Sequence, residues 1–272
     1  GDIVISNDET ATGGDGVDYW NIFNEIELNE HTEENIVEIS KTLFSSKIDN
    51  SNQPFFPNAA KDLFSAIVTY FLRNKSELNP TNKTLREYLD RSTSAEIREM
   101  LKGYADLKSM TSYISDDRSP QTQGVISELQ QLSREIFLGN FKKDGTLSMR
   151  NIVRNKGGKF VFIEYDIGVG NMLSPIYSLL YDMAIKEALC RSKTEGNVFF
   201  ITDEFSLIPN LKHVDDAVNF GRSLGIKFMI GIQNVSQVFD MYGEERGRSL
   251  LSGFLTSVAF RVNDEASRSF IK

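Results

Sequence analysis

Cysteine and histidine are nearly missing from this 272-residue chain, which has one cysteine and two histidines. The single cysteine, Cys190, excludes a disulfide framework within the chain and is typical of a reducing compartment. Three such residues are too few for a zinc site of the Cys/His type. Long apolar runs are missing too, because the longest, Leu63–Leu72, has only about half of the ~20 residues that span a membrane. We therefore expect this chain to be soluble.

A further absence concerns nucleotide chemistry. The phosphate-binding loop G-x-x-x-x-G-K-[ST], the Walker A motif, occurs nowhere in the sequence. The dipeptide Gly158-Lys159 is followed by Phe160, lacks a glycine at the required distance upstream, and precedes an apolar run. The chain by itself therefore cannot hold a β,γ-phosphate in the usual way. Either it is a fragment of a nucleotidase, or it is not a nucleotidase.

The composition is that of a folded protein, with 40% hydrophobic and 25% charged side chains and a formal net charge of −8. The charge is uneven. Residues 1–58 carry 12 acidic and 2 basic side chains, residues 59–145 carry 12 acidic and 13 basic, and residues 146–272 carry 14 acidic and 15 basic. The net charge therefore does not exclude a nucleic acid partner for most of the chain. We expect the acidic segment to lie away from any DNA-facing surface.

The spacing of apolar residues divides the chain at the same positions, into 1–58, 59–145 and 146–272. The first segment contains the β-branched run Asp2-Ile-Val-Ile-Ser6, which predicts a short strand, and helical spacing from Thr32 onward. The second segment has helical spacing throughout and no confident strand. We call residues 59–145 the helical module. The third segment alternates between apolar strands and helices.

Start signals place the helices of the helical module. Asn58 is suited to cap a helix with an apolar face through Leu63 and Ile67. Two capping-box patterns, Thr84-Leu-Arg-Glu87 and Thr93-Ser-Ala-Glu96, each predict the start of a short helix. A longer helix is predicted over 121–138.

Residues 146–272 predict an α/β arrangement. Helices are expected from Ser174-Pro175, over 214–224 with an end at Gly225, and near 236–241 and 244–252. Apolar runs predict strands at 159–163, 197–202, 227–232 and 257–261. Apolar strands that alternate with helices are typical of a parallel sheet covered on both faces.

The most specific local motif is Val198-Phe-Phe-Ile-Thr-Asp203-Glu204. An apolar strand that ends in two adjacent carboxylates places both at the carboxyl edge of a sheet, where open α/β proteins bind ligands. In nucleoside triphosphatases this is the Walker B motif: the first carboxylate holds magnesium through water, and the second orients or deprotonates the attacking water. The alternative is a strand that simply ends in a polar turn.

Other candidate side chains lie near neighbouring strand and helix ends. Gln233 ends the next apolar strand, where it could sense the terminal phosphate beside the carboxylate pair. Arg222 lies at the close of the preceding helix, and Arg248 follows Tyr242-Gly243. An arginine near a subunit boundary can stabilise the transition state on a neighbouring subunit's triphosphate. The alternative for each arginine is a solvated cation at a helix end.

Several stretches together resemble the type IV coupling proteins, the TraD/TraG-type ATPases of conjugation and type IV secretion. The resemblance runs in order from Gly1 to the C-terminus and is loosest in the helical module. The stretches are Gly1-Asp-Ile-Val-Ile, Val17-Asp-Tyr-Trp20-Asn-Ile-Phe23-Asn-Glu-Ile, the Walker B motif, Gly221-Arg-Ser-Leu-Gly225, Gly231-Ile-Gln233-Asn-Val-Ser-Gln237-Val, Tyr242-Gly243 and Phe260-Arg261-Val-Asn-Asp264.

The resemblance implies a RecA-like nucleotide-binding domain, formed by 1–58 and 146–272 and interrupted by an inserted all-α domain, 59–145. It implies ATP and Mg²⁺ as cofactors in the parent protein, with Asp203 as the metal-holding carboxylate, Asp203, Glu204 and Gln233 at the nucleotide, and Glu204, Gln233 and Arg222 in catalysis. Because the family's Walker A motif and membrane-spanning region precede the matching part, the chain is expected to be a cytoplasmic fragment.

The resemblance also implies partners: single- or double-stranded DNA, relaxosome or effector proteins, components of the secretion channel, and a homo-hexamer at the cytoplasmic face of the bacterial inner membrane. Two alternatives stay open. In the first, the fragment is a cargo-recognition module without activity; in the second, the parent is another DNA-pumping ATPase of the FtsK/HerA type. Metal-dependent hydrolysis without nucleotide is also open, although no further metal ligand is evident in the sequence.

Overall fold

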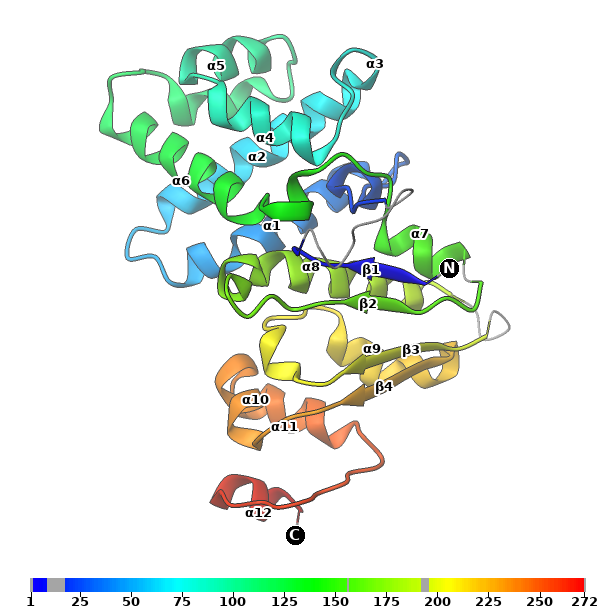
Figure 1. Ribbon diagram of the computed structural model, residues 1–272. Helices are drawn as coiled ribbons and strands as arrows, with labels where there is room; N and C mark the ends of the chain where they lie inside the picture. Colours follow the sequence, from blue (N-terminus) through cyan, green and yellow to red (C-terminus); the bar gives the residue numbers. More distant parts are fainter. Residues whose placement is uncertain (1, 9–17, 156, 192–195, 272) are drawn as a thin grey trace. The chain divides into compact units, whose positions relative to one another are not determined.

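The computed structural model describes residues 2–8, 18–155, 157–191 and 196–271 (Figure 1). None of the described helices combines the length and apolar character that crossing a lipid bilayer requires. The chain divides into two compact units. The first comprises Gly1–Ser148 and Gly158–Ile176, and the second comprises Met149–Gly157 and Tyr177–Lys272.

In the first unit, two strands that are far apart in the sequence pair with each other. β1 (Ile3–Ile5) lies parallel to β2 (Val161–Ile163), with Ile3 opposite Val161. The ladder continues beyond both strands, because Ile3 N donates to Phe160 O at 2.9 Å and Glu164 N donates to Ile5 O at 3.0 Å. The strands predicted near 2–6 and 159–163 are therefore confirmed, and the helical module lies on the connection between them.

This connection begins and ends at one place. Trp20 forms a parallel bridge with Leu147; Asn21 N donates to Leu147 O, and Leu147 N donates to Tyr19 O, both at 3.0 Å. The buried amide of Asn82 ties the helical module to the same segment, since Asn82 Nδ2 donates to Trp20 O at 2.8 Å and Ile22 N donates to Asn82 Oδ1 at 2.9 Å. The chain thus leaves and re-enters this part of the unit at neighbouring positions.

The described residues between β1 and β2 in the first unit are predominantly helical, and no strand occurs over 59–138, all of which are described. The apolar face predicted for the first helix of the module is buried, and this helix, α2, packs on α1 and α6. Phe64 of α2 meets Phe44 of α1 with ring centroids 5.9 Å apart. The elements are η1 (Ile22–Glu25), α1 (Thr32–Asp49), α2 (Phe55–Arg73), α3 (Lys75–Leu78), α4 (Asn82–Arg91), α5 (Ser94–Lys102), η2 (Lys108–Ile114), α6 (Pro120–Ile136) and η3 (Gly139–Lys142).

Two of the predicted helix starts are wrong by about one turn. Asn58 lies inside α2, which begins after Pro54, and its Nδ2 donates to Pro54 O at 2.7 Å. Thr81, not Thr84, caps α4: the side chain of Thr81 accepts from Thr84 N, while Thr84 Oγ1 accepts from Thr81 N. Thr84 satisfies the reciprocal bond of a capping box with a hydroxyl, a chemistry that a search for Glu or Gln overlooks.

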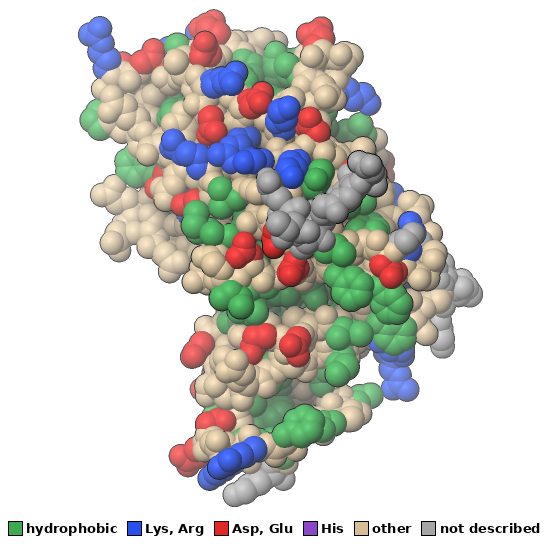
Figure 2. Space-filling view, viewed as in Figure 1, with side chains coloured by type: hydrophobic (Ala, Val, Ile, Leu, Met, Phe, Trp, Pro, Cys, Tyr) green, Lys and Arg blue, Asp and Glu red, His purple; other side chains and the backbone are tan. Residues whose placement is uncertain are grey.

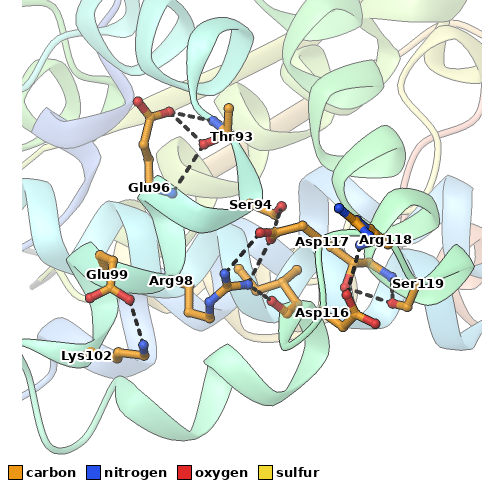
Figure 3. A network of polar contacts seen from close by, with 12 residues as sticks. Thr93, Ser94, Glu96, Arg98, Glu99, Lys102, Asp116, Asp117, Arg118 and Ser119 are labelled. Carbon is orange, nitrogen blue, oxygen red and sulfur yellow. Dashed lines mark hydrogen bonds and ion pairs between the residues drawn. The ribbon is translucent and has the colours of Figure 1, made fainter.

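The second predicted capping box is confirmed, and it opens a polar network on α5 (Figure 3). Glu96 accepts hydrogen bonds from Thr93 N at 2.8 Å and from Thr93 Oγ1 at 2.9 Å. One turn later, Arg98 donates to both carboxylate oxygens of Asp117, at 2.9 and 3.2 Å, and to Ile114 O at 2.6 Å. These bonds fix α5 against the segment that leads into α6, so this network serves the packing of the module.

The second unit contains a parallel pair with helices. β3 (Val198–Thr202) lies beside β4 (Ile226–Ile230) with Val198 opposite Ile226 and Thr202 opposite Ile230. The predicted helix end at Gly225 is confirmed by its left-handed conformation, φ 82°. The elements are α7 (Met149–Asn155), α8 (Gly170–Leu189, which starts in the first unit), η5 (Phe205–Leu207), α9 (Val214–Phe220), η6 (Gly221–Leu224), α10 (Val235–Tyr242), α11 (Glu244–Ser252) and α12 (Glu265–Ile271).

Two predictions for residues 146–272 are wrong. α8 begins at Gly170 and not at Ser174, so Pro175 lies inside its first turns instead of at its first position. Residues 257–261 form no strand, because no described segment pairs with them, and Phe260 is 96% exposed. The fold is mixed α/β with helices dominating, and its described strands form two small parallel sheets of two strands each.

Candidate functional site

The carboxyl ends of β3 and β4 bring two separate stretches of sequence together. Gly231 N donates to Thr202 O at 2.7 Å, and Phe205 N donates to Gly231 O at 2.9 Å. A side chain at position 231 would collide with this arrangement, since a Cβ there would lie 2.0 Å from the carbonyl oxygen of Asp203. The glycine between the β4 strand and Gln233 therefore allows the two strand ends to touch.

The predicted carboxylate pair stands at this edge. Asp203 is exposed and Glu204 is half-buried, and neither forms an ion pair with a described residue. Glu204 accepts a short hydrogen bond from the Ser206 hydroxyl, which restricts its carboxylate. Two uncompensated carboxylates so close together attract a cation, and a third titrating group is not required for Mg²⁺, which commonly takes one or two carboxylates and completes its shell with water and phosphate.

Gln233 lies on the second stretch, immediately before a capped helix. Asn234 Oδ1 accepts from Gln237 N at 3.0 Å, and Gln237 Oε1 accepts from Asn234 N at 3.4 Å, so α10 starts with a reciprocal capping box. The Gln233 side chain is exposed. The structure thus places Asp203, Glu204 and Gln233 at one edge of the β3–β4 pair, all available to solvent.

Arg222 lies elsewhere. It belongs to η6, which leads through Gly225 into the amino end of β4, and Val198 N at the start of β3 donates to Gly225 O at 3.0 Å. A strand of five residues separates this end from the carboxylates by about 15 Å. The Arg222 side chain is exposed and has no hydrogen bond or ion pair with the part of the chain that the structure describes. Within one chain, Arg222 and Glu204 do not share a site.

The second arginine considered from the sequence, Arg248, is engaged locally. Its Nη2 donates to Glu244 Oε1 at 2.8 Å, one turn earlier on α11, and its guanidinium lies 5.0 Å from the centroid of the Phe239 ring. A pair of exposed charges on one helix is typical of a solvated helix surface. The structure therefore favours Arg222 over Arg248 as an arginine free to reach another molecule.

Sequence reasoning missed the residues that hold the carboxylate edge in place. Phe205 directly follows Glu204, is buried, and stacks on Tyr242 of α10 with centroids 5.9 Å apart. Tyr242 Oη accepts from Leu211 N at 3.3 Å, and burial raises the pKa of this phenol well above its usual value, so it stays neutral. Arg246 covers the same ring at 4.7 Å and donates through Nε to Asp215 at 2.8 Å. The sequence signal that could have revealed this support is Phe205, an apolar residue directly after the two carboxylates.

A buried carboxylate, Asp182 of α8, binds the backbone of the segment that leads into α9. Its Oδ1 accepts from Lys212 N at 2.9 Å and from His213 N at 3.3 Å. Burial raises the pKa of Asp182, although these two backbone donors act in the opposite direction. Asp182 is 1% exposed, so it supports the loop after β3 and is not part of the edge that faces solvent. The described residues contain no group of three or more His, Cys, Asp or Glu side chains that could hold a metal without other ligands.

Comparison with known proteins gives the class of this molecule. Residues 17–272 match the sequence profile of the type IV secretion-system coupling protein DNA-binding domain. The chain belongs to the family of type IV coupling proteins.

Individual relatives agree with this assignment. The chain is 23% identical over 215 residues to the coupling protein TraD of Escherichia coli K12, which covers 76% of this chain and 29% of TraD. It is 24% identical over 232 residues to the type IV secretion system-coupling protein VirD4 of Bartonella henselae, which covers 80% of this chain and 36% of VirD4. The chain thus spans about a third of the length of these curated relatives.

Solved structures show the same fold. The unbound monoclinic form of the bacterial conjugative coupling protein TrwBdeltaN70 matches with a TM-score of 0.71 at 18% identity, over 93% of this chain and 56% of that one. The plasmid coupling protein TrwB in complex with ADP and Mg²⁺ matches with a TM-score of 0.63, over 93% of this chain and 62% of that one. TrwB has also been solved with non-hydrolysable analogues of GTP and ATP.

Proposed function

We propose that this chain is part of a hexameric, ATP-driven coupling protein that recruits DNA–protein cargo and couples ATP hydrolysis to its transfer through a type IV secretion or conjugation channel. The observation that carries the proposal is the edge of the β3–β4 pair. There, a chain of the coupling-protein family presents exposed Asp203 and Gln233 together with half-buried Glu204. Membership of the coupling-protein family favours this reading over a pump of the FtsK/HerA type.

Each residue at the edge has a distinct proposed role. Asp203, which is exposed and unpaired, would hold Mg²⁺ through water, and the ion would supply positive charge opposite the transferred phosphoryl group. Glu204 orients the attacking water or accepts its proton, with its carboxylate positioned by Ser206 and by the buried Phe205. Gln233 hydrogen-bonds the terminal phosphate from the neighbouring strand end. The nucleotide and Mg²⁺ in the solved TrwB complexes support these roles.

Arg222 is proposed to act on a neighbouring subunit. Its position at the amino ends of β3 and β4 keeps it from the carboxylates of its own chain, and its exposed guanidinium has no partner among the described residues. An arginine supplied by a neighbour stabilises the charge of the phosphoryl-transfer transition state. The proposed role needs an assembly of several copies, which we take to be a homo-hexamer.

The proposed domain organisation is a RecA-like nucleotide-binding domain interrupted by an inserted all-α domain. The pairing of β1 with β2 and the bridge between Trp20 and Leu147 support an insertion, because both bring the ends of the intervening segment together. We assign residues 1–58 and 146–272 to the RecA-like domain and residues 59–145 to the insertion. The parent protein is proposed to lie at the cytoplasmic face of the bacterial inner membrane, with DNA, relaxosome or effector proteins and channel components as partners.

The test uses the complete protein that contains this chain, with ATP hydrolysis and binding of a fluorescent ATP analogue as separate readouts. Glu204→Gln should lower kcat about 100-fold or more and leave nucleotide binding intact, because only the proton acceptor is lost. Asp203→Asn should weaken Mg²⁺-dependent binding. The matched control is Glu245→Gln, an exposed carboxylate on α11 away from the edge, which should change neither readout.

Mixed assemblies test the proposed role of Arg222. Subunits with Arg222→Ala and subunits with Glu204→Gln should each be inactive alone, whereas a mixture should regain part of the activity, because some interfaces then combine an intact Glu204 with a neighbour's intact Arg222. No recovery in the mixture would refute action between subunits. Unchanged hydrolysis by the Glu204→Gln protein would refute the proposed catalytic edge itself and favour a recognition module without activity.

A further inference from the structure

The helical module contains a pocket of about 360 Å³ between α2, α3, α4 and α5. Its walls are mainly aromatic and apolar. Figure 2 shows hydrophobic side chains exposed in the region of the module where α3, α4 and α5 lie. The residues that matter here are Tyr70, Phe71, Leu78, Tyr88, Met100 and, at the rim, Arg91.

The walls of this pocket are held by contacts within the module. The Phe71 ring lies 5.4 Å from the Tyr88 ring, and the Tyr70 ring lies edge-on to Tyr104 at 5.6 Å. The Tyr88 hydroxyl donates to Met100 Sδ at 3.0 Å, and burial raises the pKa of this phenol to about 12, so it stays neutral. Because the Tyr88 hydroxyl is engaged within the wall, the pocket offers a ligand an apolar, preformed surface. Preformed apolar pockets favour binding, because little ordering is needed when the ligand enters.

The rim carries a cation that the module leaves unpaired. Arg91, in the last turn of α4, is exposed and makes no hydrogen bond or ion pair with any described residue. Other arginines of the module are engaged, such as Arg73 with Asp106 and Arg98 with Asp117. The acidic residue that lines the pocket, Glu96, already accepts two hydrogen bonds from Thr93. The charge available to a ligand is therefore positive and lies beside an apolar cavity.

We propose that this pocket binds a segment of a partner protein in which an aromatic or branched aliphatic side chain lies next to an aspartate or glutamate. The apolar side chain enters between Tyr70, Tyr88 and Met100, and the carboxylate pairs with Arg91. The identification of the partner as a cargo protein rests on the proposed function. A peptide fits better than a nucleic acid, because phosphate backbones are bound by several cations, whereas this rim offers one unpaired arginine among the described residues and the module carries 13 basic and 12 acidic side chains.

The experiment uses the chain as it stands, labelled with ¹⁵N, and titrates an acetylated peptide, Gly-Ser-Phe-Asp-Ser-Gly-amide, followed by amide chemical shifts. Shifts should cluster at residues 70–71, 78, 88–92 and 100. Peptides with alanine in place of phenylalanine, or asparagine in place of aspartate, should bind at least about 10-fold more weakly, the equivalent of 1.4 kcal/mol per group.

Protein variants separate the pocket from nonspecific charge attraction. Arg91→Gln should weaken binding about 10-fold, whereas Arg118→Gln, an exposed arginine elsewhere in the module, should not. Leu78→Ser, at a half-buried wall position, should also weaken binding, with an unchanged far-UV spectrum showing that the module is folded. Equal affinity of the Arg91→Gln protein, shifts that fall outside the pocket, or tighter binding of a single-stranded oligonucleotide at the same residues would overturn the proposal. No nucleotide is present, so this result is independent of the test of Glu204.

Discussion

The helical module and the paired strands bury their apolar residues to very different extents. In the module, Leu63, Phe64 and Ile67 on α2 and Leu85 on α4 are completely buried. On the strands, Phe199 and Ile201 of β3 and Met229 of β4 are 65%, 63% and 68% exposed. Apart from Leu85, these residues belong to strongly apolar runs, so hydrophobicity alone does not explain the difference.

The two regions differ in how their elements satisfy backbone hydrogen bonds and cover their apolar side chains. An α-helix makes its backbone hydrogen bonds locally and needs cover on one face, which neighbouring helices of the module supply. A parallel strand needs a neighbour on each side and cover on both faces of its sheet. In β3–β4 the register places Ile201 beside Met229, so their exposed side chains form one continuous apolar surface. The core of the module is covered by its own helices and by α1, whereas this face of the strand pair is left open among the described residues.

The largest expected effect contrasts one phenylalanine from each region. Phe64→Ala, in the core of the module against Phe44, should lower the free energy of unfolding by about 3–5 kcal/mol, through lost burial and an unfilled cavity. Phe199→Ala, with the same change of chemistry on β3, should alter it by less than about 0.5 kcal/mol. Urea unfolding followed by circular dichroism measures both. A Phe199→Ala protein as unstable as Phe64→Ala would show that the open face of β3 is covered in solution.

A smaller effect tests how the helices of the module begin. Thr81→Ala should cost about 1 kcal/mol, because the Thr81 hydroxyl caps α4 and also donates to Asp144 at 2.6 Å. Glu87→Ala removes the residue that the sequence pattern assigned to a capping box, and it should change stability by less than about 0.5 kcal/mol, because Glu87 is exposed inside the helix. Thermal melts of the two proteins compare the alternatives directly. A greater loss in the Glu87→Ala protein would favour the box at Thr84 instead.

Local features were predictable from the sequence, and non-local ones were not. The capping box at Thr93 and the left-handed end at Gly225 depend on residues close in sequence, and both were located correctly. The strand predicted at 257–261 failed because a strand exists only with a partner, and periodicity cannot supply one. The start of α8 was placed late because Pro175, a favoured first residue, is tolerated here inside the helix.

In the candidate site, too, some features were predictable from the sequence and others were not. Asp203, Glu204 and Gln233 could be placed at one edge because the carboxyl ends of adjacent parallel strands coincide. Arg222, which precedes β4, lies at the opposite end of the strand pair, and the sequence analysis did not separate it from the other candidates. The stack of Phe205 on Tyr242 could not be foreseen, since it joins residues more than thirty positions apart through the packing of α10.

The smallest effects concern pH, where Asp117 of the helical module and Asp182 of α8 in the second unit should respond with opposite sign. Hydrogen bonds from Arg98 and Ser94 lower the pKa of exposed Asp117, so its stabilisation is present above the unfolded value near 3.8 and is lost as pH falls below it. Burial raises the pKa of Asp182, so the native state binds more protons than the unfolded state above pH 3.8, and stability falls as pH rises through this window. Thermal melts at a series of pH values measure both effects. The stability difference between the wild type and Asp117→Asn should shrink as pH falls. The stability of the wild type relative to Asp182→Asn should decrease as pH rises from 4. Parallel profiles for the two variants would mean that Asp182 is hydrated in solution, and would remove the contrast between a buried and an exposed carboxylate.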